Sequence, residues 1–549
     1  MLFSQYTISG KVIESESGEA IVGAVIYLSN GVQRVTTNQY GYFILTTSLS
    51  KNELVCRFPT YEPYSDELKI LKDTSIIIKL SPTTLQEVII KDDVSNHQVG
   101  FLNIPVAQLK RLPMLLGEAD LFKALTFTPG IMAGQEGTSG LYVRGSSPDQ
   151  NLVLLDESPI YNTSHAFGFL SVFNPDVVKN IDVYKGGFPA RYGGRIASVI
   201  DITMKEGNNQ KKNTELSIGV LNSRFLKEGP LVKGKSSYLI AGRLMHTALL
   251  QLPKNIKLVT KQPVQDFVGF WLYDLNIKAN HTFKDKSQLF FSFYSNYDFF
   301  KNASQNTDRL NINVLKWGSI TSSLRYNKIL TPRLFLHITS TYSHFSYQLL
   351  NEENKKIEDE QVINQTTLNN SIRDWSFKSN LDYSLNDNFI FRFGAIHIFH
   401  RFFPGRIDAI RNNVLSNVDL NNNQAIPTSE SAFYVENEWT TKPVKVNTGL
   451  RYSILGVKNQ KYTNWEPRIS LSLSVSEVHK LKLGYSVMQQ YMHQLTSNGV
   501  GLPNDIWVPA TDKVKPVNSG QAEIGWYMDL DSKKTWILSI ESYFKKCKT

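Results

Sequence analysis

Three short patterns in the sequence contain residue types that could bind a phosphate or a metal ion. Residues 229–236, GPLVKGKS, satisfy the G-x-x-x-x-G-K-S pattern of a phosphate-binding loop. His397 and His400 have the look of a metal-binding pair, and Asp529 and Asp531 could belong to a calcium loop. Each pattern can do its chemistry only if the surrounding elements place the side chains correctly. The elements therefore decide the interpretation.

The segments around these residues alternate apolar and polar side chains, which predicts strands. A phosphate loop needs a helix after it, but SSYLIAGRLM follows and alternates, so we predict a hairpin turn there. Positions three apart on a strand point to opposite faces, so His397 and His400 cannot chelate one ion. MDLDSKK is a turn-like segment without further calcium ligands. The sequence also has no G-x-S-x-G or H-E-x-x-H pattern, and we predict no enzyme, no cofactor and no metal site.

Period-two alternation continues from residue 213 to residue 549 without helical segments. In PRISLSLSV, Ile469, Leu471 and Leu473 share one face and serines share the other. Aromatic residues gather at strand ends, as the interface girdles of a membrane barrel require. A soluble sandwich would also alternate, but the succession of hairpins and the aromatic strand ends favour an antiparallel transmembrane β-barrel of about fourteen strands.

The N-terminal part predicts a small β-sandwich followed by a linker. Residues 6–81 contain YTISGKV, AVIYL, YGYFIL and SIIIKL, which are short β-type runs separated by turn residues. Residues 82–100 are polar apart from one short extended apolar segment, which consists of Leu85, Gln86, Glu87, Val88, Ile89 and Ile90. Such a segment can add as a strand to the sheet edge of a partner. The alternative is an ordinary last strand of the sandwich.

Residues 101–208 predict a small α/β domain rich in tight turns. Glycines are dense between residues 117 and 207, and short apolar runs at 152–155 and 199–202 predict buried strands. LGEADLFKALTFTPGI predicts a short helix that ends at Pro129-Gly130. The fold class is therefore mainly β, with a sandwich, a small α/β domain and an antiparallel barrel wall.

The order of three motifs in this domain is similar to a known family. VRGSSPDQNLVLLD, FNPDVVKNIDVYKGG and PARYGGRIASVIDI resemble the plug domain of TonB-dependent outer-membrane receptors. Gly10, Gly18, Gly23 and the TTNQYGYF turn resemble the carboxypeptidase-regulatory-like domain. The whole order resembles a receptor of the Bacteroidota type. The resemblance implies import of a scarce or large ligand across the outer membrane by energy-coupled movement of the plug.

The resemblance also implies partners and a location. Residues 85–90 would be the TonB box, which TonB and its inner-membrane energising complex pull. The protein would lie in the cell outer membrane, in contact with its lipid. The ligand stays open between a small molecule, a glycan, a peptide and a metal chelate, and a surface lipoprotein partner also stays open. The net charge is +10, but Lys and Arg are scattered, so we predict no nucleic-acid partner.

Polar residues of the plug-like domain have two open interpretations, ligand contact or internal hydrogen bonding. The motif residues are Arg144, Asp149, Gln150, Asn151, Asp156, Arg191, Tyr192 and Arg195. For Arg144 and Asp156, which flank strands, hydrogen bonding that holds the plug is favoured, since buried charge must be paired. We expect residues 161–169 to form an exposed apical loop, in which the candidate ligand contacts are Tyr161, Asn162, His165 and Phe167. A lone histidine more often forms a hydrogen bond than ligates a metal.

The sequence leaves alternative functions open, and its predicted barrel is small for the family. A ligand-sensing signalling receptor is the alternative function, although a dedicated signalling domain would have a different fold from the sandwich. A soluble adhesin conflicts with the plug motifs. About fourteen strands are fewer than the family's barrel has, and open edges cannot lie in lipid with unpaired backbone groups. We therefore expect an incomplete barrel wall from a truncated chain, which would make a non-functional fragment the third alternative.

Overall fold

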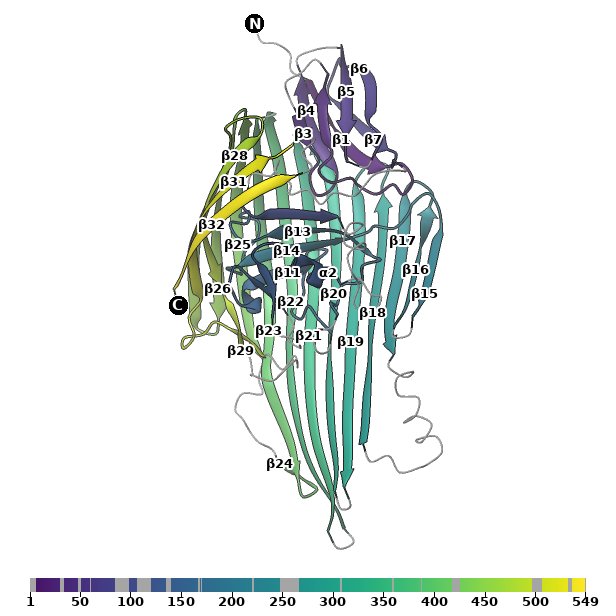
Figure 1. The fold of residues 1–549 in the computed structure, drawn as a ribbon, viewed down its shortest axis with the longest axis vertical. Helices are drawn as coiled ribbons and strands as arrows, with labels where there is room; N and C mark the ends of the chain where they lie inside the picture. The colour runs from purple at the N-terminus through teal and green to yellow at the C-terminus, as the bar shows by residue number, and fades with distance from the viewer. Residues whose placement is uncertain are drawn as a thin grey trace.

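Three β-rich units make up the structure, a computed structural model. It describes residues 6–29, 34–47, 51–59, 61–83, 98–105, 120–134, 140–165, 168, 170–219, 222–246, 266–306, 309–357, 360–386, 388–416, 425–495, 506–531 and 536–548. Figure 1 shows a small sandwich at one end of a large curved sheet, with a mixed unit in front of that sheet. No helix within these ranges is long and apolar enough to cross a membrane.

The sandwich contains two small sheets around one apolar core. One sheet has the order β4-β1-β7, with β1 Tyr6–Glu14, β4 Tyr42–Thr47 and β7 Thr74–Leu80. The other has the order β3-β2-β5-β6, with β2 Val25–Leu28, β3 Arg34–Thr36, β5 Lys51–Arg57 and β6 Tyr64–Lys69. Ile8, Ile26 and Ile78 are among the fully buried side chains between them. The sandwich that the sequence predicts is therefore present.

The mixed unit, called the inner unit below, is built on a five-stranded sheet. Its order is β12-β11-β14-β13-β8, with β8 Phe101–Pro105, β11 Asn151–Leu155, β12 Ser158–Pro159, β13 Val178–Tyr184 and β14 Ser198–Met204. Strands β11 and β14 are parallel, whereas the other pairs are antiparallel. Smaller elements complete it, namely α2 Leu121–Leu125, β9 Ile131–Ala133, β10 Leu141–Val143 and the 3-10 helix η1 Pro148–Gln150.

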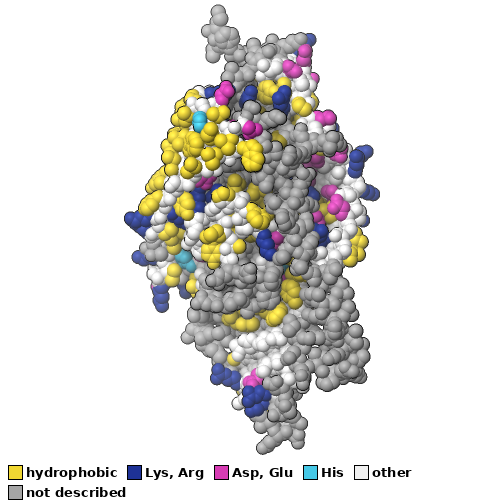
Figure 2. All heavy atoms as spheres, in the orientation of Figure 1, with side chains coloured by type: hydrophobic (Ala, Val, Ile, Leu, Met, Phe, Trp, Pro, Cys, Tyr) yellow, Lys and Arg dark blue, Asp and Glu magenta, His cyan; other side chains and the backbone are white. Residues whose placement is uncertain are grey.

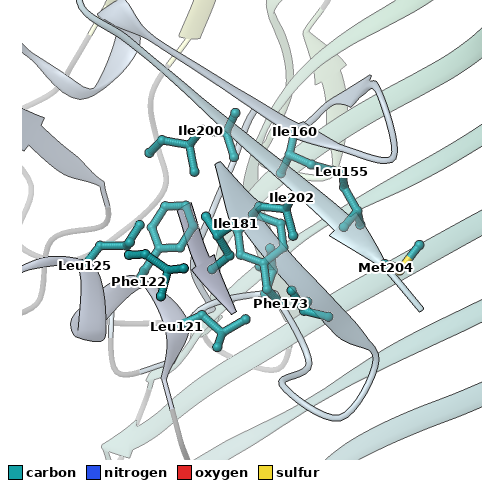
Figure 3. Packing of buried hydrophobic residues seen from close by; sticks show 14 of the residues in the cluster. Leu121, Phe122, Leu125, Leu155, Ile160, Phe173, Ile181, Ile200, Ile202 and Met204 are labelled. Atoms are coloured by element: carbon teal, nitrogen blue, oxygen red, sulfur yellow. The ribbon is translucent and has the colours of Figure 1, made fainter. Parts of the chain in front are cut away.

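Helix α2 begins and packs for clear local reasons. The Asp120 carboxylate accepts hydrogen bonds from the backbone N–H groups of Phe122 and Lys123, at 2.9 and 3.0 Å, which caps the helix. Phe122 then stacks on Phe173 with ring centroids 5.0 Å apart. Figure 3 shows these side chains meeting Ile181 from the sheet in one apolar cluster. The helix is shorter than the predicted one, but it lies in the predicted segment.

The large sheet, called the wall below, is antiparallel and contains 16 strands. Its strands in order are β15 Asn213–Ile218, β16 Asn222–Val232, β17 Ser236–His246, β18 Asp266–Thr282, β19 Gln288–Asn306, β20 Arg309–Thr331, β21 Leu334–Ile357, β22 Glu360–Asn386, β23 Phe389–Arg411, β25 Ile426–Thr441, β26 Val444–Val457, β27 Gln460–Ser474, β28 His479–Gln490, β31 Val517–Asp529 and β32 Ile537–Lys548. The short β24 Val414–Ser416 pairs with β23, and β29 Met492–Leu495 pairs with β30 Ile506–Pro509 outside the wall.

The wall is open within the described residues. Strands β15 and β32 stand at its two ends and each pairs with a single described neighbour. The predicted count of about fourteen strands is close to the observed 16, which include the short β24. The mainly β fold class is confirmed, with a sandwich, a small α/β unit and an antiparallel wall that is open within the described residues.

The two faces of the wall have different chemistry because side chains alternate along each strand. On the inward face, Asp274, Lys278 and Asp298 are buried beside the inner unit. On the outward face, exposed apolar side chains include Trp271, Phe291, Leu324, Trp375, Phe399, Phe433 and Trp465. Figure 2 shows hydrophobic side chains gathered over β28, β31 and β32 as well. An outward apolar band with aromatic residues is typical of a membrane-facing surface.

The two ends of the wall differ mainly in how far the strands extend, since a two-residue turn also occurs at the end opposite the sandwich, at residues 458–459. The sandwich end has short turns, such as residues 332–333 and 442–443. At the opposite end, strands β20 to β23 run well past the inner unit (Figure 1). Short turns and long extensions are the periplasmic and extracellular features of bacterial barrels, respectively. The sandwich end therefore corresponds to the periplasmic side.

Candidate functional site

The candidate site is the buried contact between the inner unit and the wall. Two predicted features cannot be placed in it, because residues 85–90 and Phe167 lie outside the described part of the chain. All other predicted site residues are described. Most of them reach wall strands that lie far away in the sequence.

The loop around Tyr161 differs from the exposed loop that the sequence suggests. Tyr161 and Asn162 are each 8 % exposed and His165 is 2 % exposed, because the loop packs on the inward face of the wall. The Tyr161 hydroxyl donates a hydrogen bond to Asp374. Its ring meets Trp507 edge-on, at 5.3 Å between centroids. The loop is thus part of the interface with the wall.

His165 joins the loop to two carboxylates of neighbouring wall strands. Its Nδ1 lies 2.8 Å from Asp298 and its Nε2 lies 3.1 Å from Asp274. Burial lowers the pKa of His165, but the two carboxylates outweigh burial and raise it to about 9. The imidazole is therefore charged at neutral pH. Arg243 from β17 also binds Asp274, at 2.6 Å from its Nε.

The segment 191–195 forms a second set of contacts. The Arg191 guanidinium lies 3.2 Å from Glu436, which also accepts a hydrogen bond from the Arg191 backbone N–H at 2.7 Å. The Arg195 guanidinium stacks 5.2 Å above the Trp507 ring. Tyr192 instead binds within the inner unit, because its hydroxyl donates to Asp201 at 2.8 Å.

Gly193 lies directly against a buried side chain of the wall. A Cβ atom at residue 193 would lie 2.4 Å from Nε of Arg451, a fully buried wall residue. The Arg451 guanidinium also donates to the Ala190 carbonyl at 3.3 Å. A side chain at residue 193 would displace the Arg451 guanidinium and disturb its hydrogen bond to the Ala190 carbonyl.

Arg144 contacts the last strands of the wall. Its guanidinium lies 3.2 Å from Glu523 on β31 and 3.3 Å from Glu541 on β32, and Lys185 lies 3.3 Å from the same Glu541. Arg144 has a positive φ of 51°, a conformation that few non-glycine residues adopt. The predicted role in holding the unit therefore extends beyond the unit to the wall.

Of the remaining motif residues, some contact other parts of the inner unit and others contact the wall. Asn151 is internal, since its Nδ2 donates to the Leu141 carbonyl at 2.6 Å. Asp149 accepts a hydrogen bond from Gln490 of the wall at 3.1 Å. Gln150 accepts one from Lys545 at 3.4 Å.

Asp156 combines both kinds of contact. It accepts a hydrogen bond from the Met204 backbone N–H at 3.0 Å inside the unit. Its other oxygen lies 2.8 Å from the Lys278 ammonium and accepts a 2.8 Å hydrogen bond from Ser292. A buried carboxylate is thus paired with a buried ammonium across the interface, as the cost of burying charge demands.

The phosphate-like pattern lies outside the site, and of the histidine pair only His400 reaches it, through Asp374. Residues 229–236 contain the β16–β17 hairpin, in which the Lys235 N–H bonds the Val232 carbonyl at 2.9 Å. His400 faces inward to Asp374 at 2.8 Å, whereas His397 lies on the opposite face beside Ser431. The hairpin and the opposite directions of the histidines confirm both predictions.

Sequence reasoning missed the wall residues that complete the site. Asp274 and Lys278 stand in FWLYDLNIKANH, opposite in phase to Trp271, Tyr273, Leu275 and Ile277. That phase was a usable signal, because charged residues on the polar face of a barrel strand point inward. Chemically, the described contacts are ion pairs, hydrogen bonds and ring stacking, which hold two surfaces together.

Comparison with known proteins agrees with this architecture. Three family models match, described as TonB-dependent Receptor Plug Domain at residues 103–199, CarboxypepD_reg-like domain at residues 8–90, and TonB dependent receptor-like, beta-barrel at residues 260–548. No curated protein matches the chain.

Solved structures with a similar fold include siderophore receptors. The siderophore receptor PirA from Acinetobacter baumannii has 15% identity and a TM-score of 0.53, covering 79% of this chain and 69% of that chain. A mutant of the ferric enterobactin receptor PfeA from Pseudomonas aeruginosa has 14% identity and a TM-score of 0.56, covering 84% and 73%. The pyoverdine-bound FpvA of P. aeruginosa has 12% identity and a TM-score of 0.56, covering 85% and 68%.

Proposed function

Because this chain belongs to the TonB-dependent receptor family, we propose that it imports a scarce or large ligand across the outer membrane by energy-coupled movement of the inner unit. The inner unit corresponds to the family's plug and the wall to its barrel. Receptors of this family are not enzymes.

The observation that carries the proposal is the charged contact between the inner unit and the wall. His165, Asp156, Arg144 and Arg191 each pair with an oppositely charged wall residue at 3.3 Å or less. Such pairs hold the unit firmly, yet they are separate, directional contacts that a pulling force can break one after another. Apolar wall side chains, among them Leu226, Leu239 and Ala241, also join the core of the inner unit beside these pairs.

The driving partner would be TonB with its inner-membrane energising complex. An outer membrane has no energy source of its own, so work must reach the inner unit through protein contact. Residues 85–90 precede the inner unit in the chain, and their largely apolar sequence suits strand addition.

The names of proteins with the same fold indicate which ligand class to test first. Neighbours of the same fold are named for siderophores, ferric enterobactin and pyoverdines. A ferric chelate is therefore the first candidate to test, with cobalamin, glycan and peptide as further candidates.

The test is an uptake assay in cells that express the full-length receptor. Labelled ferric catecholate, ferric hydroxamate, cobalamin, an oligosaccharide and a peptide would be offered in turn. We expect at least one to bind and to accumulate only when TonB is present. A variant that lacks residues 85–90 should still bind that ligand but should lose its accumulation. Accumulation that does not depend on TonB or on this segment would contradict the proposal.

A further inference from the structure

A polar cavity lies on the wall across strands β19 to β23. Its volume is about 590 Å³, and its lining includes Tyr297, Lys316, His344, Gln348 and Arg373. Among the described residues, the lining contains basic and amide side chains and no carboxylate, and Asp408 reaches the lining residue Asn369 from outside it. A cavity with this composition suits an anion.

Strand pairing fixes the face of the wall on which the cavity opens. Trp317 and Ile372 are buried in the cluster that packs on the inner unit's Tyr161, so they face inward. Lys316 and Arg373 are their immediate neighbours in the chain and therefore point outward. His344 lies directly opposite Arg373 in the register of β21 and β22, so it shares the outward face.

Basic side chains form a row on this face. Arg373 is directly opposite His344 on one side and directly opposite Arg401 on the other. The two arginines carry like charges in directly opposite positions, which destabilises a sheet unless something neutralises them. Among the described residues, no carboxylate lies within 4.0 Å of either arginine or of Lys316.

One nitrogen in the cavity is also unsatisfied. Nε2 of His344 is buried and has no hydrogen-bond partner within the described ranges. By contrast, Gln348 and Asn369 on the same face bond to each other at 2.8 Å, and Asn369 lies 3.5 Å from Asp408. An anion near Arg373 would accept a hydrogen bond from the imidazole N–H, which would remove the cost of that buried nitrogen.

The guanidinium of Arg373 lies over the aromatic ring of Phe403. It lies 5.4 Å from the ring centroid of Phe403, which also lines the cavity. This stacking orients a planar fork of N–H donors, a geometry that matches phosphate oxygens. The site therefore has a shaped and oriented donor set as well as positive charge.

The row of basic residues borders the aromatic band of the wall. Trp375 and Phe399 lie two positions from Arg373 and Arg401, toward the sandwich end, and both are more than half exposed. Tyr342 packs on Trp375 at 5.0 Å. Aromatic side chains of this kind mark the edge of the hydrocarbon layer. The basic row is on the extracellular side of that edge, at the level of lipid headgroups.

We propose that this cavity binds the phosphate group of an outer-leaflet lipid, with the acyl chains lying along the aromatic band below it. Arg373 would bind the phosphate through charge-assisted hydrogen bonds, and Lys316 and His344 would complete the site. Arg401 lies directly opposite Arg373, outside the cavity lining, and would add positive charge beside the phosphate. The position beside the band selects a membrane lipid over a free anion. The inference depends on the outward face of the wall and is independent of transport through the receptor.

The test uses the purified full-length receptor in detergent and three probes. These are diphosphorylated lipid A, the same lipid after enzymatic dephosphorylation, and inorganic phosphate, with binding measured by native mass spectrometry and thermophoresis. We expect diphosphorylated lipid A to bind about tenfold or more tightly than the dephosphorylated form. The variant Arg373→Gln/Arg401→Gln should lose about the same factor.

Lys461→Gln is the matched control. Lys461 is also exposed, on the outward face and on the extracellular side of Trp465, but it does not line the cavity. Its loss should leave lipid binding unchanged. If the double variant does not fold, Arg373→Lys keeps the charge but removes the planar fork and should still weaken binding.

Three results would overturn the proposal. The first is equal lipid binding by the arginine variants and the unmodified receptor. The second is equal binding of the phosphorylated and dephosphorylated lipids. The third is complete displacement of the lipid by millimolar inorganic phosphate, which would assign the cavity to a free anion.

Discussion

At the residue scale, His165 joins the inner unit to two wall strands at once. It lies between the carboxylates of Asp298 and Asp274, at 2.8 and 3.1 Å. We predict that His165→Gln lowers the free energy of unfolding by about 3–5 kcal/mol, because buried carboxylates lose a cationic partner. Urea unfolding of the purified receptor would measure the change. His397→Gln, which alters an outward histidine hydrogen-bonded to Ser431, should cost less than about 1 kcal/mol.

The same histidine predicts a dependence on pH. Its pKa is raised from the ordinary 6.5 to about 9 in the folded protein. The stabilisation is therefore fully present below the unfolded pKa and is lost as the pH rises through about 9. The stability difference between the unmodified receptor and His165→Gln should shrink over this interval. Taking the difference cancels other titrating groups, such as Asp201, whose pKa burial raises to about 7. A difference that stays constant with pH would contradict this assignment.

At the scale of single elements, the segment 85–90 should bind TonB as an added strand. A peptide of residues 82–100 with Val88→Pro lacks one backbone donor and cannot complete the strand ladder. We expect its affinity for the periplasmic domain of TonB to fall by about tenfold, measured by calorimetry. Asn96→Pro in the same peptide lies outside the segment and is the control. Equal affinities of the two proline peptides would rule out strand addition at this segment.

The hairpin at residues 232–236 predicts two opposite mutational outcomes. Lys235 is exposed and Gly234 has a positive φ of 75°. Lys235→Ala should leave folding unchanged. The unmodified receptor and this variant should both lack specific nucleotide binding, because the segment is a turn. Gly234→Val should destabilise the receptor by about 1–2 kcal/mol, since a β-branched residue is strained there. Thermal unfolding and ATP calorimetry would check both, and nucleotide binding that Lys235→Ala abolishes would refute the first.

Elements were the part of the molecule that sequence could predict. Alternation located the wall, predicted the hairpin after Gly229 and placed His397 and His400 on opposite faces, because these properties are local. It did not predict that Tyr161 and His165 would be buried. Their burial depends on Asp298 and Asp374, more than a hundred residues away. Alternation identifies the face of a strand but cannot identify the partner that covers it.

At the scale of the whole molecule, the sandwich docks on the wall and the inner unit. The Tyr40 ring stacks on His337 of the wall with centroids 4.4 Å apart, and its hydroxyl lies 2.8 Å from the same imidazole. The Glu19 carboxylate lies 3.1 Å from Lys179 of the inner unit. The sandwich therefore contacts both of the other units.

This docking predicts the effect of Tyr40→Ala. Removing the ring should weaken docking by about 1–2 kcal/mol, because stacking and a hydrogen bond are both lost. Zero-length carbodiimide crosslinking of Lys179 to Glu19, followed by mass spectrometry, should then give a clearly lower yield. Tyr64→Phe, which changes a sandwich tyrosine bonded to Asp66, should leave the yield unchanged. An undiminished yield in Tyr40→Ala would show that Tyr40 does not hold the sandwich.

The opposite chemistry of the two wall faces has a consequence for how the wall assembles. If β18 slipped by one residue against its neighbours, the side chains of Asp274 and Lys278 would point into the lipid. Trp271 and Tyr273 would then point toward the inner unit. A lysine at the middle of a bilayer costs roughly 2–4 kcal/mol. An error of one residue would thus lose both the membrane contact and the ion pairs. The register of β18 is therefore selected during insertion by two separate energies, burial of its apolar face in lipid and ion pairing of its polar face with the inner unit.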